Sequence, residues 1–163
     1  DILDFSKIEA GMLHLEKVPY SPEHAARQVC ALFEPHAQDK GLKLVFEPPV
    51  DGVPWMIVGD PHRFTQVASN LISNAVKFCD REAGRIGIAV QVLPEVLQVE
   101  VRDNGCGFDP ASLNKPKAFG INGLRERART VNGWLDISSR PGQGTSIILS
   151  VPLDSPADKG GDQ

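Results

Sequence analysis

Two kinds of hydrophobic spacing occur along the chain and predict a domain that mixes helices with strands. Apolar residues three or four positions apart indicate a helix, and strict alternation of apolar and polar residues indicates a half-buried strand. Helices are expected at residues 1–10, 22–41, 61–78 and 122–131. Extended segments are expected at residues 12–20, 42–48, 55–58, 85–93, 96–102, 134–139 and 145–151. Because helices and strands do not alternate strictly along the chain, the pattern favours an α/β (α+β) two-layer sandwich with helices on one face.

The two long helices carry clear boundary signals. Ser21-Pro22 and Asp60-Pro61 each combine a capping side chain with a proline at the first helical position. Pro35 lies inside the first of these helices and predicts a kink or a break, because proline lacks the backbone N–H group. The apolar faces expected in the core are Ala26, Val29, Phe33 and Ala37 in the first helix, and Phe64, Val67, Leu71, Ala75 and Phe78 in the second.

A polar stripe runs beside the apolar face of the second helix. It consists of Gln66, Asn70, Asn74 and Lys77, at spacings that place them on one side. Half-buried amides need hydrogen-bond partners, so a polar margin bonded to neighbouring loops is one interpretation. In the other interpretation, the amide oxygens ligate a hard cation while Lys77 neutralises phosphate. The helix alone leaves both open.

Three glycine-rich turns follow this helix. They are Asp103-Asn104-Gly105-Cys106-Gly107, Gly120-Ile121-Asn122-Gly123 and Gly142-Gln143-Gly144-Thr145. A carboxylate followed by glycines is most often an ordinary turn, but a glycine loop before a helix also suits an anion. A strand-end aspartate such as Asp103 can accept a hydrogen bond from the amino group of adenine. With a mobile lid expected at residues 108–119, this order predicts a nucleotide site.

Composition narrows the class of partner. The net charge of −4 gives no reason to expect nucleic acid or direct membrane contact, and no apolar run reaches the ~20 residues of a membrane span. Cys30, Cys79 and Cys106 form no metal-type or redox-type pair, which favours a reducing cytoplasm. The opening DILDFSKIEAG is typical of the middle of a longer protein, and the polar tail at 154–163 is expected to be disordered. We expect the isolated domain to be monomeric.

Four motifs in order resemble those of a known family. NLISNAVKF at 70–78, DNGCGF at 103–108, FGINGL at 119–124 and GQGTS at 142–146 resemble the N, G1, G2 and final glycine boxes of sensor histidine kinases. These ATP-binding catalytic domains belong to the superfamily of gyrase B, Hsp90 and MutL. The resemblance implies a Bergerat-type fold with a mixed, mostly antiparallel sheet. It implies the end of a dimerisation helix at 1–11 and the catalytic domain at 12–153.

The resemblance also implies roles for individual residues. ATP and Mg²⁺ would be the cofactors, with Asn74 and Lys77 as catalytic residues, and Asn74 and Asn70 as metal ligands. Asp103 would read adenine. The other expected nucleotide contacts are Phe78, Gly105, Gly107, Phe108, Gly120, Ile121, Asn122, Gly123, Leu124, Gly144 and Thr145. The expected partners are the dimerisation domain that carries the phosphoacceptor histidine and a downstream response regulator.

Departures from the family pattern leave alternatives. The phosphoacceptor histidine lies outside this chain, and we interpret His14, His24, His36 and His62 as surface or packing residues. Position 70 is Asn where ATPase relatives place a glutamate that activates water, which favours phosphoryl transfer to a protein side chain. A stand-alone ATPase and a degenerate nucleotide-binding or interaction module remain alternatives. The basic helix with Arg125, Arg127 and Arg129 is more typical of a solvated face than of a phosphate site.

Overall fold

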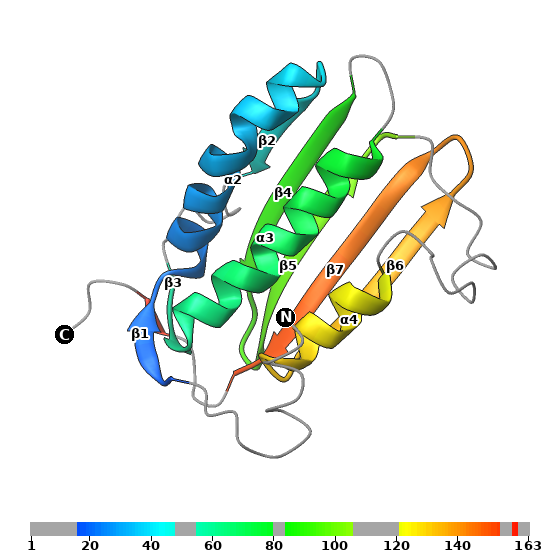
Figure 1. Ribbon diagram of the computed structural model, residues 1–163. Coiled ribbons are helices and arrows are strands. Elements are labelled where there is room, and N and C mark those ends of the chain that lie inside the picture. The colour runs from blue at the N-terminus through cyan, green and yellow to red at the C-terminus, as the bar shows by residue number, and fades with distance from the viewer. Residues whose placement is uncertain (1–15, 48–54, 80–83, 106–120, 154–157, 160–163) are drawn as a thin grey trace.

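A five-stranded sheet is the largest element of the computed structural model, which describes residues 16–47, 55–79, 84–105, 121–153 and 158–159 (Figure 1). In spatial order, the strands are β2 (Lys43–Glu47), β4 (Arg85–Val92), β5 (Val96–Asp103), β7 (Gly144–Pro152) and β6 (Trp134–Arg140). β2 runs parallel to β4, and all other neighbours in this sheet are antiparallel. The expected mixed, mostly antiparallel sheet is confirmed.

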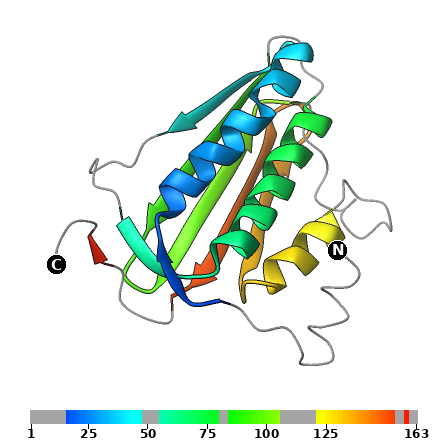
Figure 2. The ribbon, with the colours of Figure 1, turned by 60° about the vertical axis from the view of Figure 1, so that its left-hand side comes forward.

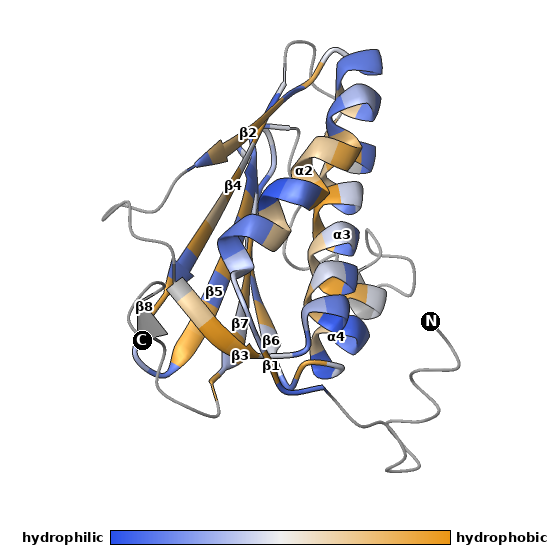
Figure 3. Ribbon diagram, turned by 90° about the vertical axis from the view of Figure 1, so that its left-hand side faces the viewer, coloured by the Kyte–Doolittle hydropathy of each residue, from blue (hydrophilic) through white to orange (hydrophobic). Residues whose placement is uncertain are grey.

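Helices cover one face of this sheet. They are α2 (Pro22–Asp39), α3 (Pro61–Phe78) and α4 (Ile121–Arg129). Figures 1 and 2 show them side by side with α3 in the middle, and Figure 3 shows helices and sheet as two layers. The predicted two-layer sandwich is therefore confirmed. Within the described ranges, none of the helices is long and apolar enough to cross a membrane.

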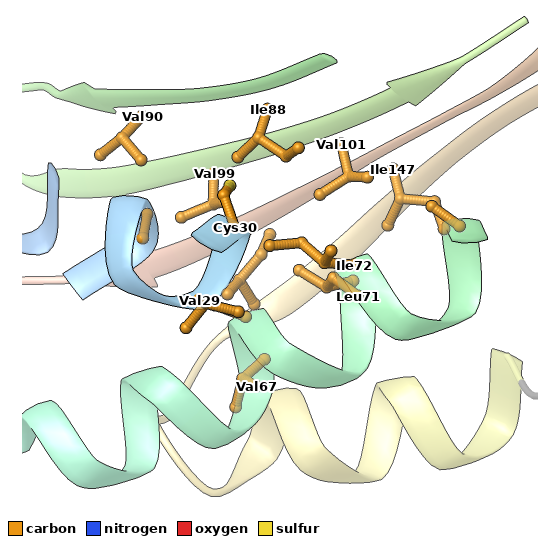
Figure 4. Close-up of a cluster of buried hydrophobic side chains, with 14 of the residues drawn as sticks. Val29, Cys30, Val67, Leu71, Ile72, Ile88, Val90, Val99, Val101 and Ile147 are labelled. Carbon is orange, nitrogen blue, oxygen red and sulfur yellow. The ribbon is translucent and has the colours of Figure 1, made fainter. Parts of the chain in front are cut away.

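The core lies between the two layers and is built from alternate strand positions. Ile88, Val99 and Val101 on the central strands are almost completely buried and face the helices (Figure 4). Leu71 and Ile72 of α3 are likewise fully buried against them. Because successive strand residues point to opposite faces, this alternation produces one apolar face per strand.

α3 is buried more widely than its apolar stripe predicts. The predicted core residues Phe64, Val67, Leu71 and Ala75 are confirmed, while the side chain of Phe78 lies outside the described part of the structure. Ala68, Ile72 and Val76 are buried in addition. The reason is position, since α3 packs on the sheet and has α2 and α4 on its two sides.

A smaller sheet corrects one prediction. Its strands β1 (Val18–Tyr20), β3 (Trp55–Gly59) and β8 (Asp158–Lys159) lie in the order β1-β3-β8, and both pairs are antiparallel. The prediction of disorder across 154–163 is therefore wrong for residues 158 and 159, because the free edge of β3 offers them backbone hydrogen bonds. The remaining tail residues lie outside the described residues, as does the helix expected at 1–10.

Two helix predictions also need correction. Of the kink or break predicted at Pro35, the break is contradicted: α2 continues through Pro35, because the buried Val29 before Pro35 and Ala37 after it hold both halves against the core. α4 ends at Arg129 instead of residue 131. There Asn132 takes a φ of 59° and the N–H of Gly133 donates to the Ala128 carbonyl (2.9 Å), which terminates the helix.

Candidate functional site

The polar stripe of α3 lies at the boundary between core and solvent. Asn70 and Asn74 are partly buried, and Lys77 is exposed. The Nδ2 of Asn70 donates to the carbonyl of Gln66 one turn earlier (2.8 Å), which directs the nitrogen to the helix. The amide oxygen is therefore the end of Asn70 suited to a cation. Gln66 accepts from Arg63 (3.2 Å) and contacts His62 (3.4 Å), so it belongs to a surface network.

The carboxyl end of α3 is held by Lys40, the residue that caps the end of α2. The Nζ of Lys40 donates to the carbonyls of Val76 (2.6 Å) and Lys77 (3.0 Å). A cation at this end satisfies carbonyls that lack helical partners and interacts favourably with the helix dipole. Lys40 therefore fixes the turn of α3 that carries Lys77.

Asp103 is the last residue of β5 and is held by backbone donors. Its Oδ1 accepts from the N–H of Gly105 (2.9 Å). Burial raises the pKa of the Asp103 carboxyl above its ordinary value, while hydrogen bonds from the backbone N–H groups of Gly105 and Thr145 act in the lowering direction. A partly buried carboxylate fixed in this way can accept further hydrogen bonds from a ligand.

The turn after Asp103 is attached to the neighbouring strand. The Oδ1 of Asn104 accepts from the backbone N–H of Arg85 (2.7 Å), and the N–H of Asn104 donates to the Arg85 carbonyl (3.2 Å). This pair of bonds joins the turn to the first residue of β4. These bonds fix the turn directly after Asp103, and with it the position of Asp103 at the end of β5.

Gly105 brings this turn against the end of α3. A Cβ atom at Gly105 would lie 3.3 Å from the Cα and 3.4 Å from the Sγ of Cys79, the residue that caps α3. Gly105 is itself buried. A Cβ atom here would be closer to Cys79 than side chains usually come, so the contact favours glycine. It places the Asp103 turn next to the end of the helix that carries Asn74 and Lys77.

Asp103 also begins a polar row across three neighbouring strands. Asp103 pairs with Thr145 of β7, and Thr145 pairs with Ser139 of β6. Paired residues point to the same face of a sheet, and the next pairs inward, Val101–Ile147 and Ile147–Ile137, contribute to the core. The polar row of Asp103, Thr145 and Ser139 therefore ends the apolar face at one end of the strands.

Gly144 occupies a conformation and a space that other residues do not fit. Its φ is 87°, in the left-handed region. A Cβ atom there would collide with the carbonyl oxygen of Asp103 and would lie 2.9 Å from the Cα of Asn104. The close backbone approach of β7 to the Asp103 turn thus depends on glycine.

Gly144→Ala should unfold the domain far more readily than Gly142→Ala. Gly142 also has a positive φ, 78°, but a Cβ there meets nothing within 4 Å. Gly142→Ala should cost only the backbone strain, about 1–2 kcal/mol. Gly144→Ala adds the collision, and we expect a loss on the order of 4 kcal/mol or more. Urea unfolding of both variants measures the difference, and equal losses would contradict the collision.

The amino end of α4 contains part of the second predicted turn, residues 120–123. Leu124 is buried and anchors the helix, whereas Gly123 is partly exposed. A side-chain nitrogen of Arg127 donates to the Gly123 carbonyl (3.3 Å), and Arg125 and Arg129 are exposed. Arg127 is thus bonded to its own helix, consistent with a solvated basic face.

Several predicted contacts fall where the structure gives no description. Gly107, Phe108, Gly120 and the expected lid at 108–119 lie outside the described residues, as do the side chains of Phe78, Ile121 and Asn122. Across the ranges that are described, no group of three or more His, Cys, Asp or Glu side chains is arranged to hold a metal. His24, His36 and His62 are exposed, as expected of surface histidines.

Three residues at or beside the site were not singled out from the sequence: Ser139, Asn104 and Lys40. Ser139 had a readable signal, because it follows Leu135 and Ile137 at the spacing of core-facing positions on the strand. The role of Asn104 depends on its register with Arg85, and that of Lys40 on a contact across 36 residues. Local pattern does not encode such distant contacts.

Comparisons with known proteins identify the family of the chain. The model of the family described as histidine kinase-, DNA gyrase B-, and HSP90-like ATPase matches residues 59–155. The signal transduction histidine-protein kinase BarA of Escherichia coli is 32% identical over 176 residues, which span 94% of this chain and 19% of BarA. The chain thus spans about a fifth of the length of the curated relatives it matches.

Solved structures show the same fold. Full-length ShkA in complex with AMPPNP superposes with a TM-score of 0.79 at 23% identity, over 96% of this chain and 35% of that one. The histidine kinase ThkA in complex with the response regulator protein TrrA gives 0.71 at 21% identity, over 93% and 47%. With its two-layer fold and the family match across α3, the Asp103 turn and β7, the chain belongs to the histidine kinase-, DNA gyrase B-, and HSP90-like ATPase family, as a catalytic domain of the histidine kinase type.

Proposed function

We propose that this domain binds Mg-ATP and transfers the γ-phosphoryl group to a histidine of a dimerisation domain in two-component signalling. One observation carries the proposal: the polar row at the end of the sheet adjoins, through the Gly105–Cys79 contact, the end of the helix that bears the amide stripe. A base-reading carboxylate and phosphate-side groups thus belong to one site. The family match and the ShkA structure with AMPPNP support ATP as the nucleotide.

The residues present fit the two groups. Asp103 is a partly buried acceptor held by two backbone N–H groups, which suits the amino group of adenine. Gly105 and Gly144 allow close backbone approach beside it. Asn70 has its amide nitrogen bonded to the helix, so its oxygen suits Mg²⁺, and Asn74 lies one turn further on. Mg²⁺ prefers oxygen ligands and keeps several waters, so one or two protein contacts suffice.

The chemistry assigned to this chain is positioning and charge neutralisation. Bound Mg²⁺ supplies positive charge that offsets the charge of the phosphates. Asn74 and Asn70 would hold it, and the ammonium of Lys77, an exposed residue, would contact a phosphate. The backbone N–H groups at the start of α4, near Gly123, bind phosphate as helix amino ends do. Orienting ATP toward an incoming histidine requires no covalent step by this domain.

The asparagine at position 70 favours transfer of the phosphoryl group to a histidine over hydrolysis of ATP. A stand-alone ATPase of this family would need a group that activates water, and the polar stripe of α3 contains no carboxylate. A degenerate binding module is disfavoured because Asp103, Asn74 and Gly144 are all present.

The partners proposed are the dimerisation domain and a response regulator, and ThkA is an example of a histidine kinase in complex with such a regulator. We place the domain, a monomer when isolated, in the cytoplasm as part of a longer sensor.

The isolated chain should bind Mg-ATP without labelling itself or hydrolysing ATP appreciably. The acceptor histidine is absent, and the stripe of Asn70, Asn74 and Lys77 contains no general base. Calorimetry measures binding, while radiolabelled ATP measures label on protein and release of phosphate. Label on His14, His24, His36 or His62 would overturn the kinase assignment. Brisk phosphate release would favour the ATPase, and no binding would favour the degenerate module.

A further inference from the structure

Two contacts of the Ser139 hydroxyl determine which way the hydroxyl of Thr145 points. Ser139 is buried, with 6% of its surface exposed. Its Oγ lies 3.0 Å from the carbonyl oxygen of Gly144 and 2.9 Å from the Oγ1 of Thr145. A carbonyl oxygen only accepts, so the single hydroxyl proton of Ser139 is directed to Gly144.

Thr145 must therefore be the donor in its contact with Ser139. The proton of its hydroxyl points toward β6, and the lone pairs of Oγ1 are what remains for other partners. Thr145 is the direct cross-strand neighbour of Asp103, so both side chains lie on the helix-facing side of the sheet. An ionised carboxylate also only accepts. The polar row thus presents acceptors alone.

An all-acceptor surface discriminates between purines. Adenine carries an amino group, a donor of two hydrogen bonds, at the position where guanine carries the carbonyl oxygen O6, an acceptor. Two acceptors suit the amino group and repel the carbonyl. A threonine hydroxyl that was free to rotate would instead turn its proton toward guanine and relax the discrimination.

We propose that Ser139 is a positioning residue that sets the preference of the site for adenine over guanine, by holding the Thr145 hydroxyl as a donor toward β6. This inference rests on the proposed function. Ser139 does not touch the base and acts through Thr145. The bond of Ser139 to the Gly144 carbonyl is what enforces the direction, because it uses the only proton of the serine hydroxyl.

Ser139→Ala should narrow the ratio of ATP affinity to GTP affinity by about fivefold to tenfold, the size expected from one hydrogen bond gained or lost. Calorimetry with Mg-ATP and Mg-GTP on the same protein measures both affinities. Ser138→Ala is the matched control, because Ser138 is the exposed neighbour on the opposite face of β6, and its ratio should equal that of the wild type. If Ser139→Ala fails to fold, the near-isosteric Ser139→Cys, a much weaker donor, should narrow the ratio in the same direction.

A double-mutant cycle tests whether Ser139 acts on nucleotide preference through Thr145. Thr145→Val removes the hydroxyl, and adding Ser139→Ala in that background should leave the affinity ratio unchanged. Equal weakening of ATP and GTP by Ser139→Ala, or an undiminished effect in the Thr145→Val background, would overturn the inference. If the wild-type protein prefers ATP and Ser139→Ala keeps the full preference, this inference is wrong but the proposed function is unaffected. A wild-type protein that binds neither nucleotide removes the proposed function as well.

Discussion

Replacing Asp103 by asparagine is expected to weaken ATP binding by at least tens-fold without changing the melting temperature of the nucleotide-free protein. The carboxylate already accepts from the N–H of Gly105 (2.9 Å), and in the proposed complex it also accepts from the amino group of adenine. An amide there could turn its NH₂ donor toward the base. Loss of a hydrogen bond to a charged acceptor costs on the order of 2–3 kcal/mol, which corresponds to roughly 30-fold to 150-fold in affinity.

The fold should tolerate this change for a specific reason. Burial raises the pKa of the Asp103 carboxyl, so the charged form is disfavoured by its surroundings. A neutral amide avoids that cost, which offsets the weaker bonds to the backbone N–H groups. Asp136→Asn, on the exposed side of β6, is the control for the loss of one negative charge and should bind ATP as the wild type does. Calorimetry and thermal melting suffice, and an unchanged affinity for Asp103→Asn would remove Asp103 from the site.

Asn74→Ala is expected to stop phosphoryl transfer to a supplied dimerisation domain, with a loss of rate on the order of 100-fold or more. Asn74 and Asn70 lie one helical turn apart, so the substitution removes one of the two amide oxygens proposed for Mg²⁺. Asn74 is only partly buried, and alanine is the best helix former, so α3 should persist.

The assay requires a matching dimerisation domain that carries its histidine. Radiolabelled ATP measures transfer at a series of Mg²⁺ concentrations, and circular dichroism verifies that α3 remains folded. Ser73→Ala is the matched control, because Ser73 is the exposed neighbour of Asn74 on the same helix. Full transfer by Asn74→Ala across the Mg²⁺ series would exclude Asn74 as a metal ligand.

The elements of this fold were largely predictable because each has a local signal. Asp60 caps α3 by accepting from the N–H of Arg63 (3.1 Å), as the Asp-Pro start predicts. The alternation in β4 and β5 likewise gives the correct buried faces. Predictions failed where a distant contact outweighs a local preference. α2 continues through Pro35 because the core holds both of its halves, and residues 158 and 159 are extended because β3 offers an edge.

The candidate site was predictable as a set of residues and only partly as an arrangement. Asp103, Asn74 and the glycines stand in motifs that the sequence displays. The junction of Gly105 with Cys79, and the alignment of Ser139 with Thr145, depend on strand register and on helix placement. Register is fixed by the whole hydrophobic pattern of a sheet, so no single segment reveals which hydroxyl lies beside which.

The small sheet has a consequence for the candidate site in the larger one. β1 and β8 flank the same strand, β3, so the first and last strands that the structure describes lie on either side of one strand. β1 pairs with residues 57–59 of β3 and β8 with residues 55 and 56, so the two flanking strands are also offset along β3. Neither of these two strands belongs to the five-stranded sheet, so the strand order around Asp103 does not depend on them.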